Sequence, residues 1–191
     1  NYAAFLLNYR NDSETAIKYY SVCNDYLLRH TEDANLRDPI YEGYARALHH
    51  NGQSKEALEK IQELLFYGKK KPESYSLPDN PDIDSIQADR RFVRILRSKY
   101  EILRDIYVQT RDTGILKAAA FTSDLIIDVI DKIRINISEE ESRIVLGDHY
   151  RDSYLMAIRD FELCYRVTSD RSYLEKAFGI AEKSKVAGLL A

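Results

Sequence analysis

One spacing pattern, between residues 41 and 72, constrains the fold of this chain more than any other feature. Ala45 and Ala57 lie on either side of Gly52, twelve residues apart (57 − 45 = 12). Larger apolar residues flank them at helical intervals: Tyr41, Tyr44, Leu48, Ile61 and Leu64. Small residues at matched positions let two helix backbones approach, and bulky neighbours fill the flanking holes. The pattern predicts an antiparallel helix pair, with Gly52 left-handed between the helices and Ser54 capping the second.

This pattern resembles the tetratricopeptide repeat (TPR), whose residues follow W-x2-L-G-x2-Y, then A-x3-F, then P. The spacings match while the residue types are softer: Tyr41 replaces Trp, Ala45 replaces Gly and Ile61 replaces Phe. Pro72 comes a few residues late. The resemblance implies stacked helical hairpins whose first helices line a surface for protein partners.

Two further segments look like repeats. Residues 1–30 contain a weaker copy, in which Asp12 caps a helix with an inner stripe formed by Ala16, Tyr20, Cys23 and Leu27. In the second half, Thr110-Arg111-Asp112 recurs as Thr168-Ser169-Asp170 at a constant offset (168 − 110 = 58). Each triplet is a polar turn between two helices, so we expect expanded hairpins there.

The composition agrees with an all-α chain. Only 7 Gly and 4 Pro are present among 191 residues, which leaves room for long helices. We expect a TPR-like α-solenoid of antiparallel hairpins with about eight helices, the longer ones in the C-terminal half. The predicted regions are 1–72 (repeats), 73–84 (loop or hinge) and 85–191 (extended hairpins).

Particular helix boundaries follow from cap residues. Asp38-Pro39 is expected to open a helix, with Pro39 at its first position, where a missing N–H costs nothing. Long helices are expected over about Asp84–Gln109 and Gly114–Arg134. Ser138 and Glu141 form a capping box for the next helix, which reaches about Arg166, and Asp170 caps the last one.

The C-terminal stretch carries a second resemblance. Leu174, Ala177-Phe178, Ala181-Glu182, Ser184-Lys185 and Leu189-Leu190 are similar to the last TPR hairpin ahead of a CHAT domain, a caspase-like protease module of bacteria. The resemblance implies a regulatory region of a longer bacterial protein, whose protease domain lies beyond Ala191. It implies a cytoplasmic location and assigns no catalytic residue to this chain.

Charge and motifs argue against several function classes. The net charge of −3 gives no basic field for nucleic acid, and no apolar run approaches the ~20 residues that span a bilayer. Cys23 and Cys164 are far apart, and no metal, nucleotide or catalytic-triad motif is present. We therefore expect no catalytic, cofactor-binding or metal-binding residue. The partner is expected to be a protein or peptide, or the protein's own missing C-terminal domain.

The candidate partner-binding residues fall into two groups. By TPR register, Glu42, Arg46, His49 and His50 face the docking surface. A basic helical stripe, led by Arg90, Arg94 and Arg97 and continued by Arg104 and Arg111, could dock an acidic segment. Both groups also have a structural interpretation, as helix-end histidines and as a solvated face paired with acids. The recurring tyrosines are expected to pack in helix seams rather than stack on bases.

Three functions remain open at this point. The first is the regulatory scaffold of a CHAT-type protease, and the second is a TPR sensor module of a bacterial signalling regulator. The third is an enzyme with a cavity between its helices, which perturbed ionisable groups in a deep pocket would indicate.

Overall fold

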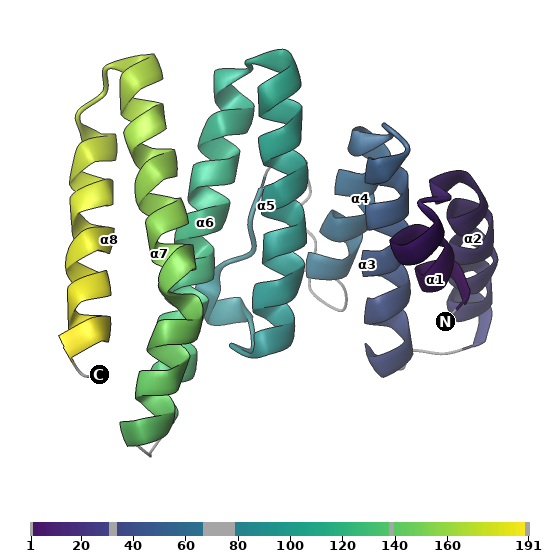
Figure 1. Ribbon diagram of the computed structural model, residues 1–191, viewed down its shortest axis with the longest axis horizontal. Coiled ribbons are helices and arrows are strands. Elements are labelled where there is room, and N and C mark those ends of the chain that lie inside the picture. The colour runs from purple at the N-terminus through teal and green to yellow at the C-terminus, as the bar shows by residue number, and fades with distance from the viewer. Residues whose placement is uncertain (1, 31–33, 67–78, 138–139, 190–191) are drawn as a thin grey trace. The chain divides into compact units, whose positions relative to one another are not determined.

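The computed structural model describes residues 2–30, 34–66, 79–137 and 140–189. These residues form eight α-helices, one short 3-10 helix and no strand, as the all-α prediction requires (Figure 1). The chain divides into two compact units, Asn1–Leu77 and Pro78–Ala191. The predicted hinge at 73–84 stays a prediction, because its first half, 73–78, lies outside the described residues.

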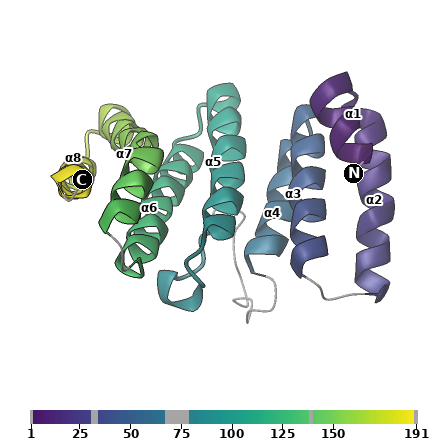
Figure 2. The ribbon, with the colours of Figure 1, turned by 60° about the horizontal axis from the view of Figure 1, so that its bottom comes forward.

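The first unit contains α1 (Tyr2–Arg10), α2 (Ser13–His30), α3 (Ala34–His50) and α4 (Ser54–Leu65). Neighbouring helices pack against each other in chain order (Figure 2). Ala45 of α3 and Ala57 of α4 have no exposed surface, so the two matched small residues lie in the core. Gly52 has φ +80° in the turn between these helices, which confirms its predicted left-handed conformation.

The inner stripe of α2 is also confirmed. Ala16, Tyr20 and Leu27 are buried, and Cys23 is half-buried. Asp12 caps the helix by accepting a hydrogen bond from Thr15 N at 3.0 Å. The preceding Asn11 has φ 52°, so the turn from α1 to α2 passes through one left-handed residue.

Two predicted boundaries in this unit are wrong. Helix α3 begins at Ala34, so Pro39 lies in its second turn and not at its first position. Pro39 is exposed, and its missing N–H removes one hydrogen bond of this helix. Ser54 is the first residue of α4 and does not cap it, because its hydroxyl pairs with His49 Nδ1 at 3.1 Å.

The second unit contains α5 (Arg90–Thr110), α6 (Thr113–Ile135), α7 (Glu140–Thr168) and α8 (Ser172–Leu189). The four helices stand side by side in chain order (Figure 1). Their lengths confirm the expectation of longer helices in this half. The predicted start near Asp84 is wrong, since residues 83–85 form a 3-10 turn and Asp89 caps α5 through Phe92 N at 2.7 Å. The capping box of Ser138 and Glu141 lies outside the described side chains.

The two turns of this unit share one geometry. Arg111 and Ser169 are left-handed, with φ 57° and 60°. Thr110 Oγ1 donates to Ile106 O at 2.8 Å, and Thr168 Oγ1 donates to Cys164 O at 2.7 Å. The following aspartates accept from the first backbone N–H groups of α6 and α8. The repeat predicted from the 58-residue offset is therefore a repeat of structure.

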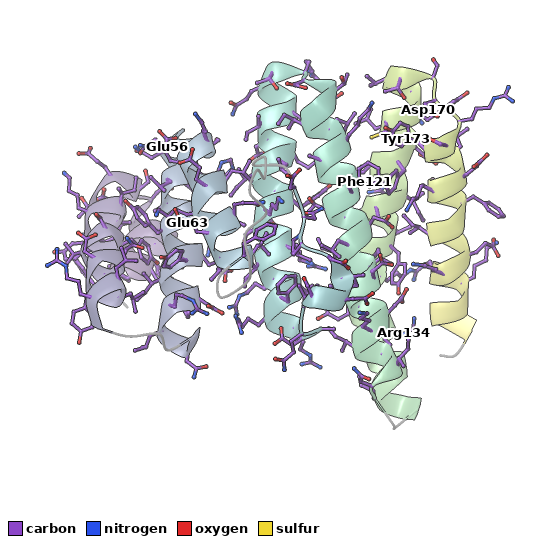
Figure 3. All side chains as sticks on the ribbon, turned by 180° about the vertical axis from the view of Figure 1, so that it is seen from behind. Glu56, Glu63, Phe121, Arg134, Asp170 and Tyr173 are labelled. Atoms are coloured by element: carbon purple, nitrogen blue, oxygen red, sulfur yellow. The ribbon has the colours of Figure 1, made fainter. Side chains whose placement is uncertain are left out.

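The helices of the second unit are joined by aromatic and ionic contacts. The Phe161 ring of α7 lies 5.8 Å from Phe121 of α6 and 6.2 Å from Tyr173 of α8. Figure 3 labels Phe121 and Tyr173 on these two helices. Lys176 and Lys183 of α8 each pair with an aspartate of α6 at 2.8 Å, namely Asp124 and Asp128. The ion pairs therefore link α6 directly to α8, in addition to the ring contacts that both helices make with α7.

The segment that precedes α5 is held along α5 and α6 by two lysines. The buried Lys99 amine donates to Asp79 O and to Asn80 Oδ1, and Lys132 Nζ donates to Ile83 O at 3.1 Å. Burial lowers the pKa of Lys99 to about 7, against the charge of Asp79, which raises it. A lysine without exposed surface thus serves as an internal anchor of the fold.

Candidate interaction faces

The four candidate residues of the first unit lie on one side of α3 but make different contacts. Arg46 Nη2 donates to Asn8 Oδ1 of α1 at 3.2 Å, so the first helices of the two hairpins meet there. His49 pairs with Ser54 at the start of α4, and His50 is exposed with its ring 6.4 Å from that of His49. Glu42 is half-buried. The contacts of Arg46 and His49 lead to two different helices, α1 and α4, and the role of the four residues in partner binding stays a prediction.

The predicted arginine stripe has two kinds of members. Arg90 and Arg94 are exposed in the first turns of α5. Arg97 donates to Ser153 of α7 and lies 5.8 Å from the centre of the Tyr150 ring. The middle of the stripe therefore holds α5 against α7, and only the outer arginines keep the exposed position that docking requires.

A second arginine makes the same kind of connection two turns further along α5. Arg104 Nη1 lies 3.4 Å from Asp160 Oδ1, and its guanidinium lies 5.6 Å from the centre of the Tyr107 ring. The Arg97–Ser153 and Arg104–Asp160 pairs have the same offset (153 − 97 = 56 and 160 − 104 = 56). A constant offset means that α5 and α7 run parallel and in register.

Asp160 is the most buried charged member of this seam. Asp160 is 2% exposed, and this burial raises the pKa of its carboxyl. The charge of Arg104 and hydrogen bonds from Tyr100 and Ser123 act in the opposite direction and lower that pKa. Burial together with the Asp160 charge also raises the pKa of Tyr100. Asp160 Oδ2 has no hydrogen-bond partner among the described residues, so the Arg104 charge beside Oδ1 adds to the stabilisation from Tyr100 and Ser123.

The solvent side of this seam combines apolar and charged side chains. Val108 of α5 is 55% exposed and Val167 of α7 is 43% exposed. We call this surface the α5/α7 face; it is formed by Arg90, Arg94, Glu101 and Val108 of α5 and by Asp152, Met156, Arg159, Leu163 and Val167 of α7. Apolar contacts with a charged rim are typical of protein-binding surfaces.

Two features of the described residues bear on metal and thiol chemistry. No group of three His, Cys, Asp or Glu residues in the described part of the chain is placed to hold a metal ion. Burial raises the pKa of the Cys164 thiol to about 11, which keeps it protonated at neutral pH. The described helices include none that is long and apolar enough to cross a membrane.

Sequence reasoning missed the α7 partners of the arginines. One signal for them was present in the 58-residue repeat, because Asp160 aligns with Ile102 (160 − 58 = 102). Ile102 is buried, as is Asp160. A carboxylate at a core position of a repeat requires a buried cation or several hydrogen bonds. The arginine stripe on α5 supplies that cation, at Arg104.

No family model matches the chain, and no curated protein matches it. Two solved structures are similar: the nearly identical TPR-like repeats of a candidate kinesin light chain from Podosopora anserina, and a single-substitution variant of the same repeats. Their identities to this chain are 15% and 16%, with TM-scores of 0.46 and 0.47. Each match covers 98% of this chain and 87% of the other.

Proposed function

We propose that this chain is a non-catalytic helical scaffold that binds a protein segment along the α5/α7 face. The observation that carries the proposal is the exposure of Val108 and Val167 beside arginines on two parallel, registered helices. Apolar anchors surrounded by charged side chains supply both affinity and orientation for a bound segment. Helices that are already packed lose little freedom on binding, which favours affinity.

The first unit contributes a second surface of the same kind in this proposal. The contact between Arg46 and Asn8 joins α1 to α3, as Arg97 and Arg104 join α5 to α7. By the TPR resemblance, these are the first helices of successive hairpins, which line the partner-binding side. Glu42, His49 and His50 belong to this side of α3.

Selection from a library of displayed peptides tests the proposal, because it does not require the partner to be identified first. Peptides recovered on the wild-type chain are expected to bind it in solution, as measured by fluorescence anisotropy. The Arg94→Glu, Arg159→Glu double variant should weaken that binding at least tenfold, because both side chains are exposed on the α5/α7 face. Lys185→Glu, exposed on α8, is the charge-reversal control and should leave it unchanged. Equal binding by all three proteins would place the docking surface elsewhere.

The finer part of the proposal is that the scaffold regulates a CHAT-type protease. Its support is the resemblance of the α8 sequence, together with the exposure of Leu174 (39%) and Phe178 (67%), four residues apart on α8. Such a pair gives a neighbouring domain an apolar contact. The full reading frame tests this directly, since a caspase-like His and Cys are expected after Ala191. A coiled coil or kinase-like segment there would instead identify a sensor module of a signalling regulator.

A further inference from the structure

Helices α1 and α2 expose an unusual number of aromatic side chains. We call this group the aromatic surface, and the exposed fractions of its members are between 46% and 79%. Its members are Tyr2, Phe5 and Tyr9 of α1 and Tyr19, Val22 and Tyr26 of α2. The tyrosines that were expected to pack in helix seams lie later in the chain, from Tyr41 to Tyr165, so these four tyrosines form a separate group.

The aromatic surface is continuous. On each helix its three residues follow the spacing i, i+3, i+7, which places them on one side of the helix. Phe5 stacks on both of its α1 neighbours, with ring centroids 6.3 Å from Tyr2 and 5.5 Å from Tyr9. Tyr2 makes an edge contact with Tyr19 of α2 at 5.2 Å, so the two helices present one surface.

The other side of the same helices already forms the core of the first unit. Ala3, Leu6 and Leu7 of α1 pack with Ala16 and Tyr20 of α2 in one buried cluster. Both helices are therefore apolar on two sides. A helix of that kind is normally buried on both, whereas among the described residues the aromatic surface remains open to solvent.

Its area corresponds to one half of a protein interface. We multiplied about 200 Å² for each aromatic residue by its exposed fraction and added a smaller contribution for Val22. The exposed area of the aromatic surface is then roughly 700 Å². This exceeds the ~300–600 Å² of the largest apolar patch on a typical monomer. It approaches the ~800 Å² that each partner contributes to a standard stable interface.

The charges around the surface favour a second copy of the same chain. None of its six members is charged, so two copies can meet there without repulsion between like charges. The adjacent side of α2 is balanced, with Glu14 and Lys18 paired at 3.0 Å and with Asp25 near Arg29 in sequence. Tyrosine-rich, uncharged centres with a polar rim are characteristic of interface cores.

We propose that the chain forms a two-fold symmetric dimer in which the aromatic surface of α1 and α2 packs against the same surface of a second copy. In a two-fold dimer the same surface of each copy meets the other, so a surface without charged side chains can pair with itself without repulsion. The dimer uses side chains of the first unit, whereas the α5/α7 face belongs to the second, so the two proposals can fail independently.

Sedimentation equilibrium on residues 1–191 tests the dimer. The mass is expected to rise from 22.2 kDa to twice that value between about 1 and 100 µM protein. Tyr9→Glu with Tyr26→Glu should keep the chain monomeric over this range, since two charges per copy would enter a closed apolar interface. Phe178→Glu, an exposed aromatic of α8, is the matched control and should still dimerise.

Three results would overturn the proposal. A wild-type chain that stays monomeric would mean that another partner or segment covers the surface. Growth beyond twice the monomer mass would indicate open head-to-tail stacking, and loss of the dimer in Phe178→Glu would assign the contact to α8. Circular dichroism checks that the variants are folded; if the double variant is not, Tyr9→Arg alone serves, because Tyr9 is 79% exposed.

Discussion

Gly43 of α3 lies against the Tyr20 ring of α2, and replacing it by Ala should destabilise the first unit. A Cβ added at Gly43 would lie 2.3 Å from Tyr20 Oη, 2.4 Å from Cζ and 2.7 Å from Cε1. Carbon atoms in contact prefer about 3.5–4.0 Å, so the ring would have to move by more than ~1 Å. Tyr20 is 2% exposed and stacks near Tyr44 at 6.4 Å, which leaves it no free direction.

The size of the effect follows from two opposing terms. Overpacking of a tight core costs about 1–3 kcal/mol, and the clash with three atoms of the Tyr20 side chain puts the cost of Gly43→Ala at about 3 kcal/mol. Replacing a glycine inside a helix by alanine gains about 1 kcal/mol. The net loss in the free energy of unfolding is therefore about 2 kcal/mol. Gly179→Ala in α8 has nothing within 4 Å of its new Cβ and should stabilise the chain by about 1 kcal/mol.

Native-state hydrogen exchange is the suitable assay, because it separates the two units. Amide exchange of the slowest α2 and α3 protons should quicken about thirtyfold in Gly43→Ala, while α5 to α8 keep their rates. In a Tyr20→Leu background the same glycine substitution should lose most of its cost, as the shorter side chain leaves room for Cβ. If Gly43→Ala slows exchange as Gly179→Ala does, the close approach of α2 to α3 is not present and the reasoning is refuted.

Three further predictions concern single positions. Burial lowers the folded-state pKa of Lys99 to about 7, so between pH 7 and 9 the unfolded state binds more protons than the folded state. Urea titrations of the wild type should therefore show the second unit becoming more stable over this range, by at most ~1.4 kcal/mol per pH unit. In Lys99→Met this pH dependence should be absent. Arg104→Met should destabilise the same unit by about 3 kcal/mol in urea at pH 7, and Arg104→Met with Asp160→Asn should recover most of it, because the first change leaves a buried carboxylate without its countercharge and the second removes that negative charge. Gly52→Ala should lower the thermal stability of the first unit by about 1 kcal/mol, since φ +80° strains any side chain although no atom is near; an unchanged melting temperature would contradict this.

The parts of the fold that sequence predicted well depend on local chemistry. The Thr-x-Asp turns at 110–112 and 168–170 are correct in detail because the threonine hydroxyl and the aspartate carboxylate bond backbone groups within four residues. Such bonds form whatever the rest of the chain does. Gly52 and Asp12 were predictable for the same reason.

The candidate site was harder, because its arrangement depends on distant partners. Arg94 and Arg97 look alike in sequence, yet Arg97 is half-buried against Ser153 and Tyr150 while Arg94 is exposed. What distinguishes them is the position of α7, more than fifty residues later. The prediction for Pro39 was wrong because α3 begins five residues earlier, at Ala34.

The helices α1 and α2 show the limit of periodicity most clearly. Tyr19 and Tyr20 are adjacent and each belongs to an apolar stripe at helical spacing, yet Tyr20 is 2% exposed and Tyr19 is 47% exposed. Periodicity indicates which sides of a helix are apolar and gain stability when they are buried. It carries no information on which part of the structure buries them. For Tyr20 the cover is α3, including the bare backbone at Gly43. Tyr19 is only partly buried by the described residues. The proposed dimer would bury the rest of its side chain.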